Sequence, residues 1–127
     1  MKISASILTF CLLCVSSQLV HAGEILSNDK VKSITNGKTV HATHEKKGFN
    51  FSVYFNADGS AVRKWKGGKI QQGKWFFKDN LHCINVGGGD KCATIEDNGD
   101  GTYKRLKGGN SDKHFITWNK FVDGKDF

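Results

Sequence analysis

The chain has 127 residues, contains no proline, and carries a formal net charge of +7, with 19 Lys and Arg against 12 Asp and Glu. This length is typical of one domain with a modest core and excludes an array of separate domains. A basic excess of this size favours anionic partners, although it also promotes solubility. After residue 22, no stretch is long and apolar enough to span a bilayer.

The first residues have the layout of a secretory signal peptide. Lys2 precedes an apolar run from Ile7 to Val15, and the residues ending at Ala22 form the region in which signal peptidase cleaves. The apolar run is shorter than the ~20 residues that a membrane-spanning helix needs, which disfavours a retained anchor. We therefore expect cleavage after Ala22 and export to the periplasm or the medium. The mature chain is then a single domain, residues 23–127, with 18 basic and 12 acidic side chains and a net charge of +6.

Two cysteines, Cys83 and Cys92, remain after this processing. Exported proteins meet an oxidising compartment, and a glycine run between the two residues lets the chain reverse, so the pair predicts a disulfide across a hairpin. A loop of this size stabilises the fold by about 2.7 kcal/mol in the chain-entropy treatment. Neither cysteine belongs to a CxxC pair, which disfavours a metal or redox role.

One short helix is expected near the start of the mature chain. Between Leu26 and Gly37 the apolar residues are spaced for one helical face. Ser27 or Asn28 can cap its N-terminus, and Gly37 supplies the left-handed stop. The apolar stripe is narrow, so this helix needs a larger surface to pack against.

The rest of the chain alternates apolar and polar residues with a period of two, interrupted by turns rich in Gly, Asn and Asp. This pattern predicts a mainly β fold, an antiparallel meander of about eight strands curled into a barrel or half-barrel with the short helix over one opening or face. A β-sandwich is the competing architecture. The expected strands cover residues 39–43, 49–55, 61–66, 74–78, 81–86, 91–95, 103–106 and 114–121.

Several of these features together resemble a family of small uncharacterised exported bacterial proteins. The shared features are a short helix leading into a Gly-x-Thr turn, an aromatic strand with an Asp-Gly turn, a Gly-x-Trp triplet and a cysteine pair. The resemblance implies a fold and a compartment but no catalytic residue. The residues that carry it are Leu26, Ser27, Val31, Ile34, Gly37–Val40, Val53–Gly59, Gly73–Trp75, Cys83 and Cys92.

Basic residues interleaved with aromatic ones are the main candidate for a binding surface. If the strands that hold them are neighbours, their outward side chains converge into one positive stripe that suits anionic envelope lipid, acidic polysaccharide or an anionic protein. Nucleic acid is not expected as a partner of an exported chain. The alternative is simple two-faced alternation, with aromatic residues inside and lysine outside. The candidate residues are Lys64, Lys66, Lys74, Lys78, Lys104 and Arg105.

The four histidines of the mature chain are expected at the surface. His41 and His44 are three apart in an extended segment and so point to opposite faces, which disfavours a shared metal. His82 and Cys83 are adjacent on a strand and also cannot meet. A deep polar pocket at His41, His44 or His114 would favour an enzyme, whereas a filled core would favour binding.

Three functional interpretations stay open. The leading one is a non-enzymatic binding or inhibitor-like module with an anionic partner. The second is a small hydrolase or metal-dependent enzyme that uses the histidines, and the third is a structural protein of the envelope. The leading interpretation involves no catalytic residue, cofactor or metal.

Overall fold

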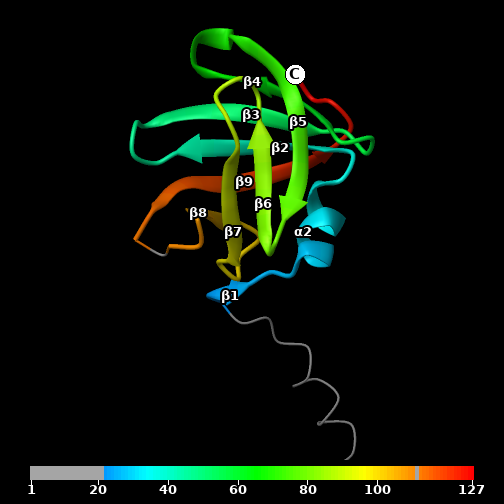
Figure 1. The fold of residues 1–127 in the computed structure, drawn as a ribbon. Helices are drawn as coiled ribbons and strands as arrows, with labels where there is room; N and C mark the ends of the chain where they lie inside the picture. The colour runs from blue at the N-terminus through cyan, green and yellow to red at the C-terminus, as the bar shows by residue number, and fades with distance from the viewer. Residues whose placement is uncertain (1–21, 111) are drawn as a thin grey trace, which may run out of the picture.

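The computed structural model describes residues 22–110 and 112–127, so the expected signal peptide lies outside the described residues except for Ala22. Eight antiparallel strands follow one another as a meander, and β9 pairs with β2, which closes the sheet into a barrel (Figure 1). The prediction of a meander barrel is confirmed, and the sandwich is excluded. The barrel strands are β2 (Lys38–His44), β3 (Phe49–Phe55), β4 (Ser60–Lys64), β5 (Ile70–Lys78), β6 (Leu81–Asn85), β7 (Lys91–Asp97), β8 (Tyr103–Lys107) and β9 (His114–Asp123).

The predicted helix is present as α2 (Asn28–Thr35). The Ser27 side chain accepts a hydrogen bond from the Lys30 backbone N–H at 3.2 Å, and Gly37 follows with a φ of +72°. The helix contacts both β2 and β6, which lie on opposite walls, and buries Val31 against the core. It therefore covers one end of the barrel, the end at which β5 meets β6 (Figure 1).

A short strand, β1 (Glu24–Ile25), precedes the helix and pairs with the last residues of β7. The β6 ladder on β7 ends at Ala93, so β1 occupies the edge of β7 that β6 leaves free. This pairing attaches the start of the described chain to the barrel wall.

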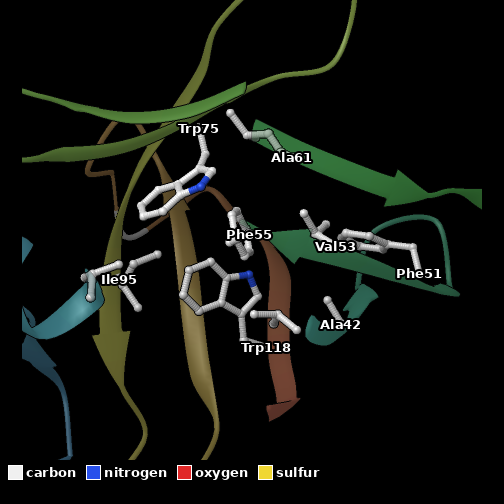
Figure 2. Packing of buried hydrophobic residues seen from close by; sticks show 11 residues of the cluster. Ala42, Phe51, Val53, Phe55, Ala61, Trp75, Ile95 and Trp118 are labelled. Carbon is white, nitrogen blue, oxygen red and sulfur yellow. The ribbon is translucent and has the colours of Figure 1, made fainter. Parts of the chain in front are cut away.

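Aromatic residues fill the centre of the barrel. The ring of Phe55 lies 5.7 Å from that of Trp75 and 6.1 Å from that of Trp118, and all three are almost fully buried (Figure 2). Val53 lies between Phe55 and Phe51, and Ile95 lies on the opposite side of Phe55 from them (Figure 2). The core next to the helix is therefore packed with side chains.

One glycine in β5 permits a close approach of two backbones. A Cβ atom built on Gly73 would lie 1.8 Å from the carbonyl oxygen of Asn85 on β6, far inside any van der Waals contact. No side chain fits there, so the requirement for glycine comes from the neighbouring strand.

The disulfide between Cys83 and Cys92 is present. The two residues are directly opposite each other in the middle of the three register pairs that join β6 and β7, one pair from the open end of the hairpin. Of the described helices, none is both long and apolar enough to cross a membrane.

Candidate functional site: a basic mouth of the barrel

The meander sorts the loops of the barrel between its two ends. Four hairpin loops, residues 45–48, 65–69, 86–90 and the described part of 108–113, lie at the end away from α2, and the three others lie at the helix end. The helix-end loops contain Asp58, Asp79 and Asp100 and no basic residue. The loops at the far end contain five lysines and three acidic residues, namely Lys46, Lys47, Lys66, Lys69 and Lys113 with Glu45, Asp90 and Asp112. The loops thus differ in charge between the two ends, with basic loops at the far end and acidic loops at the helix end.

Arg63 on β4 points into the barrel at the basic end. It is paired with the buried Val53 across the β3–β4 ladder, and cross-strand pairs share a face. Its Nε donates a hydrogen bond of 2.8 Å to Oε1 of Gln71, and its guanidinium lies 3.9 Å from the centre of the Trp65 ring. Burial lowers the pKa of Arg63 from its ordinary value, because the charged form loses hydration.

Arg105 on β8 also lies inside the barrel, with only 8% of its surface exposed. Its guanidinium donates three hydrogen bonds, to Nδ1 of His82 at 2.8 Å, to the His82 carbonyl at 3.2 Å and to the Lys91 carbonyl at 2.8 Å. Desolvation, with a smaller effect of the Arg63 charge, lowers the pKa of Arg105 to about 10. The prediction of Arg105 as an outward-facing binding residue is wrong, because it pairs with the inward Ile95 and shares its face.

The two guanidinium groups come from opposite walls, since β4 and β8 are four strands apart around the closed sheet. Among the described residues, neither forms an ion pair with a carboxylate. Arg105 is buried and Arg63 is half-buried, and charges removed from water are normally paired, so these two guanidinium groups favour an anion. We call Arg63, Trp65, Gln71 and Arg105, together with the four loops at this end, the basic mouth.

An aromatic cluster lines one side of the basic mouth. The centre of the Trp65 ring lies 4.8 Å from the ring centres of both Phe49 and Phe51. The His44 ring stacks on that of Phe49, with 5.2 Å between the ring centres. Desolvation, followed by the charge of Lys47, lowers the pKa of His44, so its imidazole is neutral near pH 7. The cluster provides a rigid apolar surface beside Arg63.

The predicted lysine stripe does not form. β4 and β5 are neighbours, but Lys64 is opposite Ile70 and Lys74 is opposite Ser60, so the two lysines lie at different ends of the ladder. β8, which holds Lys104, is on another wall, where Lys104 lies 3.5 Å from Glu96. Of the remaining candidates, Lys66 lies in the 3-10 turn η1 (Lys66–Gly68) at the basic mouth, and Lys78 ends β5 near the helix.

The histidines occupy four different environments. His44 lies in the aromatic cluster of the mouth, whereas His41 lies on the outer wall, so the prediction of opposite faces is confirmed. His82 is 1% exposed, so its predicted surface position is wrong, although it does face away from the disulfide-bonded Cys83. His114 contacts the Thr117 hydroxyl at 2.8 Å. Within residues 22–110 and 112–127, no three His, Cys, Asp or Glu side chains gather as a metal site.

Sequence reasoning missed Arg63 and Gln71. β5 begins at Ile70, four residues before the predicted strand. The prediction missed these residues because polar side chains such as Gln71 occupy inward positions near the mouth and interrupt the apolar alternation. Arg63 lies two residues after the buried Ala61 in the same strand, and alternate residues of a strand share a face. This spacing was the feature of the sequence that could have predicted an inward Arg63.

Comparison of the chain with protein-family models, curated proteins and solved structures finds no match.

Proposed function

We propose that this protein is an exported module that binds an anionic component of the cell envelope at its basic mouth, without changing it chemically. The observation that carries this proposal is the pair Arg63 and Arg105, two guanidinium groups inside the same end of the barrel with no carboxylate in ion-pair distance among the described residues. An anionic ligand supplies the charge that these groups lack.

The two arginines have different parts in this proposal. Arg105 uses three hydrogen bonds on acceptors of the barrel itself and contributes mainly a fixed positive charge. Arg63 uses its Nε on Gln71 and stacks on Trp65, which holds its planar group in one orientation. The terminal amino groups of Arg63 are then the direct donors to a phosphate, sulfate or carboxylate.

The loop lysines add long-range attraction to this end alone. Because the three loops at the helix end hold aspartates and no basic residue, an anionic surface is attracted more strongly to the mouth than to the opposite end, where Lys30, Lys32 and Lys78 are the nearby cations. The protein therefore binds in one orientation, with the helix directed away from its partner.

Export is part of the proposal. The signal-peptide pattern of the first 22 residues, the Cys83–Cys92 disulfide and the resemblance to small exported bacterial proteins support it, because disulfides persist in oxidising compartments. Lipid, acidic polysaccharide and anionic proteins are the partners that such a compartment offers.

The test uses the purified exported protein and two probes, phosphatidylglycerol vesicles and immobilised heparin, with phosphatidylcholine vesicles as the neutral reference. Each lysine near an anionic surface contributes about 1 kcal/mol, so removing three positive charges from the mouth weakens binding on the order of 100-fold. The variant is Arg63→Gln with Lys66→Gln and Lys69→Gln. Binding of the unaltered protein to at least one probe is expected to fall steeply as salt rises.

The matched control removes three charges at the helix end, through Lys30→Gln, Lys32→Gln and Lys78→Gln. This variant has the same net charge as the mouth variant and is expected to keep most of the binding. Equal losses in the two variants would show that net charge alone is responsible and would reject the mouth. Absence of binding to both probes at low salt would also reject the proposal and favour a structural role in the envelope.

A further inference from the structure

The outer wall of the barrel carries a second site, which borders the 65–69 loop of the mouth at one side. An open groove of about 850 Å³ lies over the outer wall formed by β2, β3 and β9 and is bordered by the last residues of the chain. Its lining includes a serine, a histidine and an aspartate that come from three different segments: Ser52 on β3, His41 on β2 and Asp126 after β9.

These three side chains form a continuous hydrogen-bonded relay. Ser52 is directly opposite His41 in the β2–β3 ladder, and its Oγ lies 2.7 Å from Nδ1 of the imidazole. Nε2 of the same ring lies 2.8 Å from Oδ2 of Asp126. The carboxylate accepts the Nε2 proton, which leaves Nδ1 as the acceptor for the hydroxyl proton of Ser52. The same order of contacts, from serine through imidazole to carboxylate, activates a serine as a nucleophile in hydrolases, although here Nδ1 rather than Nε2 faces the serine.

Asp126 is held in place by the chain around it. The backbone N–H of Asp126 donates to Oγ1 of Thr39 at 2.9 Å, and that hydroxyl donates to the Gly124 carbonyl at 2.6 Å. The Gly124 N–H donates in turn to the Gly37 carbonyl at 2.9 Å. These contacts attach the segment after β9 to the start of β2 and fix the carboxylate beside His41.

Lysines flank the relay on both sides. Lys64 is opposite Ser52 in the β3–β4 ladder, and Lys120 is opposite His41 in the β2–β9 ladder, and both line the groove. Two ammonium groups next to a nucleophile stabilise negative charge that develops on a carbonyl oxygen and attract an anionic substrate.

We infer that Ser52, His41 and Asp126 form an acyl-transfer site that hydrolyses carboxylic esters, with a preference for anionic ones. Oγ of Ser52 attacks the ester carbonyl carbon while Nδ1 of His41 takes the hydroxyl proton. The tetrahedral intermediate collapses, the bond to the alcohol oxygen breaks, and that oxygen takes the proton from His41. The acyl group then remains on Ser52.

Water completes the reaction. His41 takes a proton from a water molecule, whose oxygen attacks the acyl carbon, and the proton passes to Oγ of Ser52 as the acyl bond breaks. The products are one carboxylic acid and one alcohol, and no redox partner is required. Asp126 is a positioning residue in this scheme, because it acts on the substrate only through His41.

The test treats the full exported protein with a fluorophosphonate probe and locates the adduct by mass spectrometry, while hydrolysis of p-nitrophenyl acetate gives the rate. The expected result is one adduct, on Ser52, that is lost in Ser52→Ala and reduced at least tenfold in His41→Gln. Ser60 is the internal control, because it is also a strand serine and its hydroxyl contacts the Asp58 carboxylate but no imidazole. It is expected to remain unlabelled.

Asp126→Asn distinguishes positioning from a purely structural role. Without the carboxylate the imidazole loses the acceptor that fixes its tautomer and orientation, so kcat for p-nitrophenyl acetate falls while KM changes little, and the melting temperature stays within a few degrees. An unlabelled Ser52 in the folded protein, or equal labelling of Ser52 and Ser60, would overturn the inference. Labelling that is unchanged in His41→Gln would also overturn it.

Discussion

Inside the barrel, the guanidinium of Arg105 donates a hydrogen bond of 2.8 Å to Nδ1 of His82. The imidazole is enclosed by aromatic rings, with Phe55 at 5.1 Å and Trp118 at 5.4 Å. Desolvation, followed by the Arg105 charge, lowers the pKa of His82 well below its ordinary value. The cation of Arg105 is therefore held in the core by a neutral base and two carbonyl groups. No carboxylate neutralises it among the described residues, so its positive charge adds to the electrostatic potential at the mouth.

Replacement of Arg105 by methionine is expected to destabilise the fold. The change leaves the His82 nitrogen and the carbonyls of His82 and Lys91 without their donor, and an unsatisfied buried polar group costs about 1–3 kcal/mol. We expect the free energy of unfolding in urea to fall by roughly 3 kcal/mol, because part of the loss is offset by the apolar side chain. The double variant Arg105→Met with His82→Phe is expected to recover part of it. A stability equal to that of the unaltered protein would show that these hydrogen bonds contribute nothing.

Stability is expected to decrease on acidification below pH 6.5. Above this value His82 is neutral in both the folded and the unfolded chain, so its full contribution is present. Below it the unfolded chain binds a proton that the folded core excludes, and the free energy of unfolding falls by about 1.4 kcal/mol per pH unit. Urea unfolding at pH 7.5, 6.0 and 5.0 measures this slope.

Two variants assign that slope to a residue. His82→Gln is expected to flatten the profile, whereas His44→Gln is expected to change it only slightly, because the His44 pKa is lowered less and its side chain is partly exposed. An equally steep slope in His82→Gln would show that another group titrates.

Gly73→Ala is expected to be strongly destabilising. Its Cβ would lie 1.8 Å from the Asn85 carbonyl oxygen, so β5 and β6 must separate, with a loss of about 3 kcal/mol or more in the free energy of unfolding. Gly88→Ala is the matched control, because a Cβ there meets nothing within 4 Å and its φ is not positive. Thermal unfolding of both variants tests the difference, and equal melting temperatures would contradict the close approach of the strands.

Removal of the disulfide in Cys83→Ala with Cys92→Ala is expected to lower the free energy of unfolding by about 2.7 kcal/mol, because the unfolded chain regains the entropy of the closed loop. In the unaltered protein, thiol labelling under native, non-reducing conditions is expected to find neither sulfur. Rapid labelling of both sulfurs in folded protein would show that the bridge does not form.

Local patterns in the sequence were sufficient to predict most of the elements. Alternating side chains from Phe49 to Phe55, the Ser27 cap and the glycine-bearing turns each report on a few neighbouring residues, and the structure confirms the strands and the helix that they predict. The Cys83–Cys92 pair was also predictable, because the loop between the two cysteines is short. Even the clustering of charge in alternate loops follows once the meander is assumed.

Only the tertiary structure decided which groups meet across long distances in the chain. The inward position of Arg105 depends on its register with β7, and a shift of one residue would have turned it outward. Arg63 joins the same lumen because closure of the sheet places β4 opposite β8. Ser52, His41 and Asp126 come together because the segment after β9 folds back along β2, a contact between residues 85 apart. Local periodicity carries no information on such pairings, since they are set by strand order, closure and register.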